Sequence, residues 1–384
     1  MSRDALAPGE LTRERVRLQS IELREFRNHK EARFDLRGRS ALVLGENGSG
    51  KTNLIEAVVL LSIGKSFRGS RDAALLRRGA QAFEVRGVVE DRIGVTREII
   101  ARGGDGPKEI AVDGSPLPRV TDLLGRFCTV HFSVEDVAVM NGGPASRRRF
   151  LDVALCQLES GYVASLRDYT AALRQRNQLL FAERRGHRPE EGEWSAWEEI
   201  LARAGVALDR RRRALCAELD HHLRALARSV DPRMDPALQY GDGLGDLDLP
   251  EEEEVVARLE RLTHARAVDR KMGWTMHGPH RARLRCTIAG EELTDGASRG
   301  FSRLYSILLR LALAQVFEER QNDAPVVLLD DPESELDPRW IGRLLELVPE
   351  SSQLLVTACR ELSTMPERLK RLPIAEGALV GSAA

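Results

Sequence analysis

The sequence contains few aromatic residues, few cysteines and no long apolar run. Aromatic side chains make up 5% of the 384 residues, so base stacking is not the expected way for this chain to bind single-stranded nucleic acid. The five cysteines are scattered and form no C-x-x-C pair, which argues for reduced thiols in a cytoplasm and against a zinc site. No stretch approaches the roughly 18 apolar residues of a membrane span, so we expect no transmembrane helix.

An excess of charge of either sign is also missing. The net charge is −1, so the chain has no global basic field, and any nucleic-acid site must be a local basic patch. Residues 1–15 mix charged residues with proline and lack an apolar core, so they do not resemble a signal peptide. We expect them to form a flexible N-terminal extension.

One stretch, residues 45–52, fits the phosphate-binding pattern G-x-x-x-x-G-K-[ST] at every fixed position. Apolar runs predict a strand before it, at 41–44, and a helix after it, at 53–61. Glycines let backbone N–H groups point at phosphate oxygens, Lys51 faces the β- and γ-phosphates, and the Thr52 hydroxyl is a ligand for Mg²⁺. The alternative is a glycine-rich turn without a ligand. The predicted nucleotide-binding residues are Gly45, Glu46, Asn47, Gly48, Ser49, Gly50, Lys51 and Thr52.

A second apolar run, 326–329, ends in two aspartates, Asp330 and Asp331. Ligands of α/β sheets bind at the carboxyl ends of the strands, so these carboxylates are well placed for catalysis. We expect Asp330 to hold Mg²⁺, directly or through water, and Asp331 to orient or deprotonate the attacking water. The alternative is a strand followed by an acidic turn, and the phosphate-binding pattern elsewhere in the chain favours the catalytic interpretation.

Ser298 and Gly300 stand at the start of a predicted helix that runs to about residue 319. A serine at a helix N-terminus is usually only a cap. Beside a glycine it can also bind an anion, for instance a γ-phosphate, so both interpretations are open.

The order of elements predicts the fold class. Strand patterns at 83–89, 93–100 and 109–112 predict an antiparallel meander. The pattern is helical from residue 145 to about 229, interrupted at 186–192, and alternating strands and helices return in the last third. We therefore predict an α/β ATPase head, with a mixed sheet and an antiparallel subdomain, that carries an inserted helical domain. The predicted units are the extension 1–15, the N-terminal lobe 16–144, the helical insert 145–270 and the C-terminal lobe 271–384.

The order of these motifs resembles the RecF family of ABC-type ATPases over about residues 16–360. Short motifs spread along the chain carry the resemblance. They are Phe26-Arg27-Asn28, Gly45–Asn53, Gly64-Lys65-Ser66-Phe67-Arg68, Gly142-Gly143-Pro144, Arg147–Asp152, Gly278-Pro279-His280-Arg281, Ser298-Arg299-Gly300, Leu329-Asp330-Asp331 and Ser334–Asp337.

The resemblance implies a head similar to those of Rad50 and SMC proteins, with a compact helical domain in place of a long coiled coil. It implies that ATP clamps two heads into a homodimer, in which Ser298 and Gly300 of one chain meet the nucleotide held by Lys51 of the other. Hydrolysis would then release the dimer. It also implies binding of single- and double-stranded DNA, and work with RecR and RecO to load RecA at gapped DNA in repair, replication and the SOS response.

Several positions depart from the patterns of ABC-type ATPases. Many ABC-type ATPases have a glutamine in their signature motif where Phe301 stands, and Phe301 cannot form its hydrogen bonds. No histidine follows the strand predicted at 353–357, where transporter ATPases place one. We therefore expect a weak ATPase, whereas Lys51, Thr52 and Asp330 preserve nucleotide binding. The departures are Arg283, Arg299, Phe301, Asp331 and the stretch Thr357-Ala358-Cys359-Arg360.

Basic residues cluster just after the phosphate-binding helix. Through the resemblance we interpret this cluster as a contact to the DNA backbone, with strong salt dependence and little sequence preference. The run 210–213 is interpreted as a solvated helix face, and His277 and His280 as structural. The candidate DNA contacts are Lys65, Arg68, Arg71, Arg77 and Arg78.

The alternatives to a DNA-repair clamp come from other classes. In transporter-coupled ATPases the phosphate loop and the signature motif are separated by far fewer residues than Lys51 and Ser298 are in this chain. A chromosome-organising Rad50/SMC-like protein needs sustained heptads, and the helices predicted between 145 and 229 are too short. A RecF-like ATP sensor with little turnover stays open because of Phe301 and Arg283.

Overall fold

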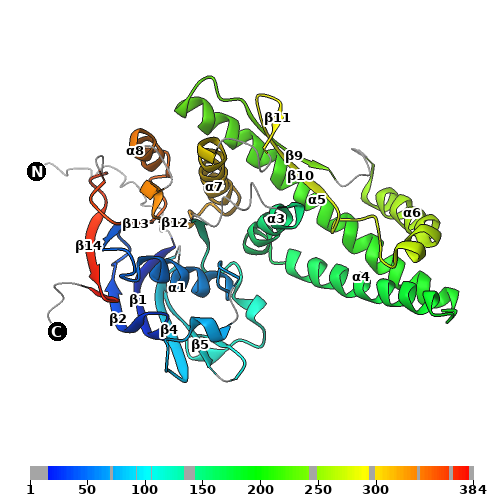
Figure 1. Cartoon of the computed structure of the whole chain (residues 1–384), viewed down its shortest axis with the longest axis horizontal. Coiled ribbons are helices and arrows are strands. Elements are labelled where there is room, and N and C mark those ends of the chain that lie inside the picture. Colours follow the sequence, from blue (N-terminus) through cyan, green and yellow to red (C-terminus); the bar gives the residue numbers. More distant parts are fainter. Residues whose placement is uncertain are drawn as a thin grey trace, which may run out of the picture.

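The computed structural model has a head built around two sheets and an elongated helical part, which lie side by side in Figure 1. The blue and red segments meet in the head, so both ends of the described chain contribute to it, and the green segments form the helical part. The structure describes residues 16–69, 72–91, 93–104, 106–133, 143–241, 249–293, 299–334, 338–362 and 366–379, with the backbone alone at 299–301, 338 and 339.

The first sheet of the head is mixed and has the order β15-β14-β3-β13-β12-β8. The strands from β14 to β8 run parallel, and β15 returns antiparallel to β14. The parallel order places the carboxyl ends of β3, β12 and β13 at one edge of the sheet, where ligands of such sheets bind. The strands are β3 (Ala41–Leu44), β8 (Thr129–Phe132), β12 (Val326–Asp330), β13 (Leu354–Ala358), β14 (Lys370–Ala375) and β15 (Ala378–Leu379).

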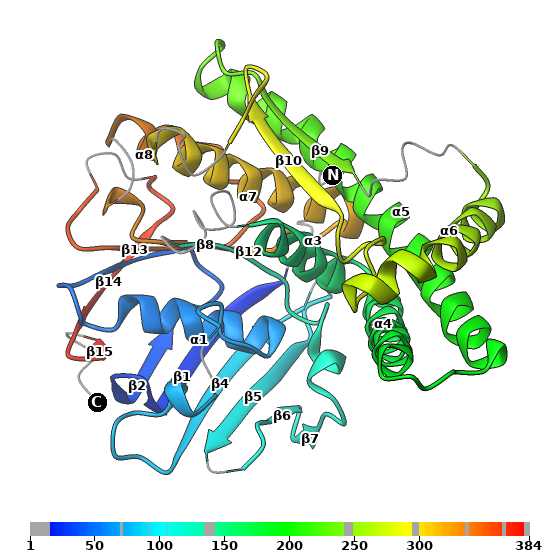
Figure 2. The same ribbon diagram turned by 45° about the vertical axis from the view of Figure 1, so that its right-hand side comes forward.

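The second sheet is antiparallel and has the order β2-β1-β4-β5-β6-β7. The predicted meander is confirmed, although the strand expected at 93–100 begins at Thr96. Helix α1 (Lys51–Ile63) lies between the two sheets (Figure 2) and is buried on all sides, as a helix covered on two faces must be. The strands are β1 (Arg17–Phe26), β2 (His29–Asp35), β4 (Ala82–Glu90), β5 (Thr96–Gly104), β6 (Glu109–Val112) and β7 (Ser115–Pro116).

The helical part contains α3 (Pro144–Leu158), α4 (Tyr162–Arg184), α5 (Glu191–Val230) and α6 (Glu251–Met272). The prediction of two long helices between 145 and 229 is wrong, because α3 ends at Leu158 and α4 begins at Tyr162. At the predicted interruption, α5 starts with a capping box between Glu190 and Glu193. The 40 residues of α5 pack against both α4 and α6, so the helices form a compact unit.

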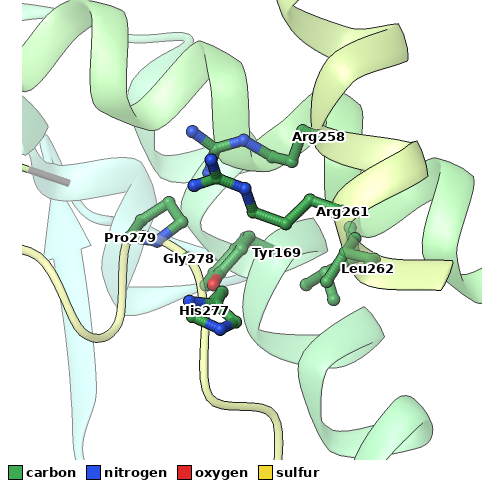
Figure 3. A pocket seen from close by; sticks show the side chains of 8 residues that line it. Tyr169, Arg258, Arg261, Leu262, His277, Gly278 and Pro279 are labelled. Carbon is green, nitrogen blue, oxygen red and sulfur yellow. The ribbon is translucent and has the colours of Figure 1, made fainter. Parts of the chain in front are cut away.

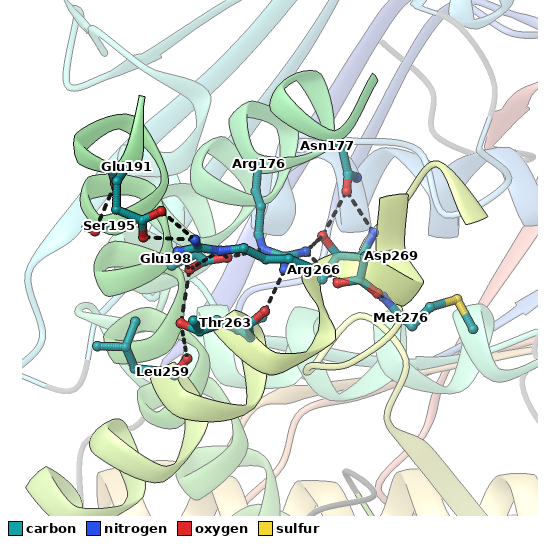
Figure 4. A network of polar contacts seen from close by, with 12 residues as sticks. Arg176, Asn177, Glu191, Ser195, Glu198, Leu259, Thr263, Arg266, Asp269 and Met276 are labelled. Carbon is teal, nitrogen blue, oxygen red and sulfur yellow. Dashed lines mark hydrogen bonds and ion pairs between the residues drawn. The ribbon is translucent and has the colours of Figure 1, made fainter. Parts of the chain in front are cut away.

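A buried cluster of charged residues holds α4, α5 and α6 together (Figure 4). Arg176 of α4 pairs with Glu198 of α5 at 3.0 Å and with Asp269 of α6 at 2.7 Å, and these side chains are at most 1% exposed. Arg266 of α6 makes a further contact to Glu198, at 2.6 Å. Arg176 also donates to the hydroxyl of Thr275 at 2.8 Å, which ties the loop after α6 to the same cluster.

A third, small sheet has the order β11-β10-β9. Its strands are β9 (Pro236–Gly241), β10 (Arg283–Ile288) and β11 (Glu291–Glu292). β9 lies between α5 and α6, in a segment for which we predicted no strand. β10 pairs with β9 rather than with a strand of the head sheets. The domain boundary expected between residues 270 and 271 stays a prediction.

Helix α7 (Arg299–Gln321) runs between the head and the helical part, and α8 (Pro338–Glu346) lies beside it on the head. One apolar core contains Leu308 of α7, Leu219 of α5 and Val327 of β12, so the head and the helical part are joined by packing. The expected fold class, an α/β head with an antiparallel subdomain and added helices, is confirmed. In the described part of the chain, no helix is long and apolar enough to cross a bilayer.

Candidate nucleotide-binding site

The phosphate-binding pattern forms the turn between β3 and α1, at the carboxyl end of β3. Gly48 and Gly50 adopt positive φ angles of 82° and 106°, a region that glycine enters without steric cost. At Gly45 the requirement is space, because a Cβ atom there would lie 2.4 Å from the carbonyl oxygen of Ile374. The glycines of the pattern therefore provide both the backbone conformation and the close packing of this turn.

Lys51 is the first residue of α1 and is 6% exposed. Its ammonium donates to the carbonyl oxygens of Gly45 at 2.6 Å and Glu46 at 2.9 Å, inside the loop. The Sγ atom of Cys359 lies 3.5 Å from the same nitrogen. Because carbonyl oxygens carry no net charge, the two backbone contacts orient the ammonium without neutralising it.

Thr52, Asp330 and Thr357 form a chain of hydrogen bonds. The Oδ1 atom of Asp330 accepts from the hydroxyl of Thr52 at 3.1 Å and from that of Thr357 at 2.6 Å. Burial raises the pKa of the Asp330 carboxyl, whereas the two hydroxyl hydrogen bonds act in the opposite direction. Hydroxyl and carboxylate oxygens are the ligands that Mg²⁺ prefers, so the residues Thr52 and Asp330 fit the predicted metal site.

Asp331 has a φ angle of 47°, which is uncommon for a residue other than glycine. Its N–H donates to the hydroxyl of Thr357 at 2.9 Å, so this threonine contacts both aspartates. Its Oδ1 atom is buried without a hydrogen-bond partner in the described residues, and the residue borders the same pocket as Lys51 and Thr52. Asp331 therefore lies at the edge of the pocket, where a water-orienting group would act.

One pocket brings five of the eight predicted phosphate-binding residues together, with about 530 Å³ of empty space that opens to solvent. Arg68 enters it from the loop after α1, where its Nη1 atom donates to Asn53 Oδ1 at 3.1 Å. Arg68, a candidate DNA contact, thus lines the nucleotide pocket, and its contact with DNA stays a prediction. The pocket is lined by Asn47, Gly48, Gly50, Lys51, Thr52, Asn53, Arg68 and Asp331.

The turn after β13 forms a further wall of the site. The thiol of Cys359 donates to Asn47 Oδ1 at 2.9 Å, at the position where a histidine was sought in the sequence. Asp331, Glu333 and Cys359 place ligand atoms within 4.8 Å of one another. Glu333 Oε1 already accepts from the N–H groups of Cys359 and Arg360, at 2.8 and 3.2 Å, which gives this carboxylate a structural role.

The part of the predicted site that Ser298 and Gly300 form lies mostly outside the described residues. Ser298 is not among them, and Gly300 and Phe301 are described by their backbone in the first turn of α7. Arg283, another departure, is exposed at the first position of β10. The roles of Ser298 and Gly300 stay predictions.

Three further residues contact the phosphate loop from outside and were not predicted to do so. Asn28 of the β1–β2 turn, His29 at the start of β2 and Gly377 of the β14–β15 turn each lie against backbone carbonyls of the loop. Arg27 of the first turn pairs with buried Glu56 of α1 at 2.6 Å. Asn28 belongs to a motif that carried the resemblance, whereas no feature of the sequence marked Gly377.

The other candidate DNA contacts differ in their surroundings. Lys65 and Arg78 are exposed, and Arg77 pairs with Glu25 at 2.5 Å. Arg71 lies outside the described residues. Contact of this group with DNA therefore stays a prediction.

The arginine run 210–213 makes ion pairs within the helical part. Its partners are Glu254, Glu159 and Asp152. Arg212 is 3% exposed, so the interpretation of the run as solvated is wrong at this position. The pairing agrees with a structural role for the run.

A smaller cavity lies in the helical part, between α4, α6 and the loop after α6 (Figure 3). Arg258 and Arg261 extend side by side into it, and Arg258 pairs with Asp209 at 2.6 Å. The cavity has space for little more than one water molecule. It therefore does not compete with the pocket at Lys51 as a ligand site.

His280 lies next to this cavity and is held by two hydrogen bonds. One joins its Nδ1 atom to the hydroxyl of Tyr169 at 2.6 Å, and the other joins Nε2 to the carbonyl of Thr275 at 3.0 Å. Burial lowers its pKa to about 4. These contacts agree with the structural role that the sequence indicated for this histidine.

Comparisons with known proteins support one family. The family model described as "RecF/RecN/SMC N terminal domain" matches residues 17–372. The DNA replication and repair protein RecF of Moorella thermoacetica is 35% identical over 352 residues, which are 92% of this chain and 92% of the relative. That of Myxococcus xanthus is 33% identical over 345 residues, 89% of this chain and 90% of the relative.

Solved structures agree with the sequence comparisons. A structure described as the recombination mediator protein RecF with ATP, in the RecFOR pathway, has a TM-score of 0.88 at 29% identity and covers 97% of this chain and 99% of that chain. An Smc head domain derived from Pyrococcus furiosus has a TM-score of 0.55 at 17% identity over 95% of each chain, which shows a shared fold alone. The first match extends through the helical part as well as the head.

Proposed function

The chain belongs to the RecF family of DNA replication and repair proteins, within the wider RecF/RecN/SMC family, and on this premise we propose that it is an ATP-controlled DNA-binding clamp of recombinational repair. In this proposal ATP and Mg²⁺ bind at the phosphate loop, and two chains form a dimer around the nucleotide. The dimer binds single- and double-stranded DNA at gaps and duplex junctions and acts with RecO and RecR to load RecA.

The observation that carries this proposal is the geometry around Lys51. Its ammonium is oriented by carbonyl oxygens, and it lines a pocket that is open to solvent. The hydroxyl of Thr52, which lines this pocket, and the carboxylate of Asp330, 278 positions away in the chain, meet at 3.1 Å. The solved RecF structure with ATP, which matches nearly the whole chain, supports ATP as the ligand.

Each residue of the pocket has a proposed role in binding or hydrolysis. Backbone N–H groups of the loop bind phosphate oxygens, and Lys51 contacts the β- and γ-phosphates. Thr52 and Asp330 would hold Mg²⁺, which when bound neutralises part of the phosphate charge. Asp331 accepts a hydrogen bond from the attacking water and can take its proton, because it lines the same pocket as Lys51 and Thr52.

The proposed dimer completes the site. α7 begins at Arg299 and Gly300, and the predicted anion-binding Ser298 immediately precedes it in the sequence. In the proposal, Ser298 and Gly300 of the partner contact the γ-phosphate held by Lys51, so dimerisation reports that ATP is bound. Hydrolysis removes that contact and releases the dimer.

A second candidate function, an ATP sensor with little turnover, is favoured by Cys359. This thiol, and not an imidazole, contacts Asn47 and lies 3.5 Å from the Lys51 ammonium at the end of β13. A neutral thiol is a weak hydrogen-bonding group, so it stabilises transferred phosphate charge less well than a histidine would. Slow hydrolysis would leave binding and dimerisation intact.

The experiment that tests the proposal compares DNA binding with ATP, with ADP and without nucleotide. Fluorescence anisotropy of a labelled gapped duplex and analytical ultracentrifugation would be measured for the wild type and for Lys51→Met, which keeps the side-chain length and removes the charge. We expect ATP to produce a dimer and to tighten DNA binding at least about tenfold. Both effects should be lost in Lys51→Met.

Two controls separate the parts of the proposal. Lys271→Met removes an exposed lysine of α6 and should behave as the wild type. Ser298→Arg should leave ATP binding intact and abolish the ATP-dependent dimer. Equal DNA binding by the wild type in all three nucleotide conditions would contradict the clamp. Loss of ATP affinity in Ser298→Arg would place Ser298 in the site of its own chain.

A further inference from the structure

The carbonyl groups of the phosphate loop have partners that come from outside the loop. The carbonyl of Gly48 accepts from the side-chain amide of Asn28 at 3.1 Å. The carbonyl of Ser49 accepts from the N–H of Gly377 at 2.9 Å. The carbonyl of Gly50 accepts from the N–H of Leu54 at 3.0 Å and faces His29 Nε2 at 3.2 Å.

These contacts fix the direction of the loop's N–H groups. A peptide unit is planar, and its C=O and the following N–H point in opposite directions. Holding the carbonyl of Ser49 therefore holds the N–H of Gly50, and holding that of Gly50 holds the N–H of Lys51. A phosphate loop binds its ligand with such N–H groups, so a rotated peptide plane would remove a contact to the phosphates.

His29 connects two of the outer contacts. Its ring is fully buried, with Nδ1 2.7 Å from the carbonyl of Gly377 and Nε2 3.2 Å from that of Gly50. The packing leaves no slack, because a Cβ atom on Gly50 would lie 2.7 Å from the His29 ring. The Gly377 turn is held equally closely, since a Cβ atom there would lie 3.0 Å from the Asn28 carbonyl.

We propose that Asn28, His29 and the Gly377 turn are positioning groups that hold the peptide planes of residues 48–50 in the phosphate-binding orientation. The contact between His29 and Gly377 joins residues 348 positions apart, so the affinity of the phosphate loop depends on a hairpin near the other end of the chain. The inference rests on the proposed binding of ATP and names the groups that prepare the loop for it. None of the three touches the reacting atoms.

The test uses variants that remove or restore one donor. His29→Phe keeps the ring shape and removes both nitrogens, whereas His29→Asn keeps an amide donor near the position of Nδ1. Binding of ATP and ADP would be measured by calorimetry at 25 °C in the full chain with Mg²⁺. We expect His29→Phe to weaken both nucleotides about three- to tenfold, the range for losing one net hydrogen bond, and His29→Asn to recover most of the loss.

Two further variants make the result decisive. His280→Phe removes a histidine of the helical part that makes two hydrogen bonds, and it should lower the melting temperature without changing nucleotide affinity. Asn28→Ala truncates a half-buried side chain and should weaken the binding of ATP about threefold. This variant tests the proposal even if His29→Phe does not fold.

The outcomes distinguish this inference from the proposed function. If the wild type binds ATP and Asn28→Ala binds it equally well, the positioning role is wrong and the proposed function stands. The same conclusion follows if a folded His29→Phe keeps full affinity. A wild type that binds no ATP contradicts the proposed function itself, and the inference with it.

Discussion

The phosphate loop and the charged cluster of the helical part both contain a nearly buried cationic side chain, yet they satisfy it in opposite ways. Lys51 is held by two carbonyl oxygens, at 2.6 and 2.9 Å. Arg176 is held by two carboxylates, Glu198 at 3.0 Å and Asp269 at 2.7 Å (Figure 4). The first residue borders a pocket open to solvent, and the second is enclosed by three helices.

The difference separates a binding site from a structural cluster. Neutral carbonyls leave the field of Lys51 intact for an anionic ligand, whereas the carboxylates cancel that of Arg176. Burying a charge without an opposite charge costs free energy, so such a charge persists only where an ionic ligand can pair with it or where dipoles stabilise it. The polarity of the partner thus distinguishes the two sites better than the charge or burial of the side chain does.

The largest effect should come from breaking the cluster. Arg176→Met leaves Glu198 and Asp269 buried with fewer cationic partners, and we expect a loss of about 3–5 kcal/mol in the free energy of unfolding. ATP affinity at 25 °C should stay unchanged, because the cluster does not reach the phosphate loop. Urea unfolding and calorimetric titration measure the two quantities. The double variant Arg176→Met/Asp269→Asn should recover part of the stability. A loss below about 1 kcal/mol in the single variant would contradict a structural role for the ion pairs of Arg176.

A pH series compares two histidines, one in each region, of which His29 is buried and His280 is half-buried. The pKa of His280 is about 4 in the folded chain, against 6.5 ordinarily, and burial also lowers the pKa of His29. The unfolded chain binds these protons more readily, so stability is complete above pH 6.5 and falls as the pH decreases below it. His280 should account for about 2 kcal/mol between pH 7 and pH 5. Unfolding of wild type and His280→Gln at these two pH values should show a smaller pH dependence in the variant, and identical pH dependences would exclude this role for His280.

The smallest effect on stability should follow from Thr357→Val, which removes an uncharged contact beside the nucleotide pocket. Asp330 loses one of two hydroxyl donors and the N–H of Asp331 loses its acceptor, at an expected cost of about 1–2 kcal/mol. Hydrolysis of ATP should fall more than ATP affinity, because both aspartates lose the group that positions them. Melting temperature and turnover would be compared with Thr357→Ser, which keeps both bonds. Equal turnover in the valine and serine variants would show that this hydroxyl does not position the aspartates.

The nucleotide pocket was largely predictable, because its chemistry lies in short windows of sequence. The loop 45–52 carries its glycines, lysine and threonine within eight positions, and Asp330 directly follows an apolar strand. The structure brings Thr52 and Asp330 to 3.1 Å, as their predicted shared ligand requires. Local spacing specifies these residues because one turn and one strand end position them.

Contacts between distant segments could not be predicted in this way. Thr357 was noted only for the histidine missing after it, and its contacts to both aspartates depend on the pairing of β12 with β13. The approach of Gly377 to His29 depends on where the last described hairpin packs. The strand β9 begins with a proline and lacks clear alternation, and its pairing with β10 stabilises it. In each case the partner is specified by the tertiary fold.

The position of β3 in the sheet has a consequence for the synthesis of the protein on the ribosome. β3 leads into the phosphate loop, and its two neighbours, β13 and β14, lie at residues 354–358 and 370–375. At about 5–20 residues per second, the roughly 300 residues in between take about 15–60 s to make. During that time the strand has no partner on either edge and the loop lacks the Gly377 turn. The phosphate loop, the first part of the nucleotide site to be translated, thus gains its neighbouring strands and the Gly377 turn only when the last described hairpin has been made.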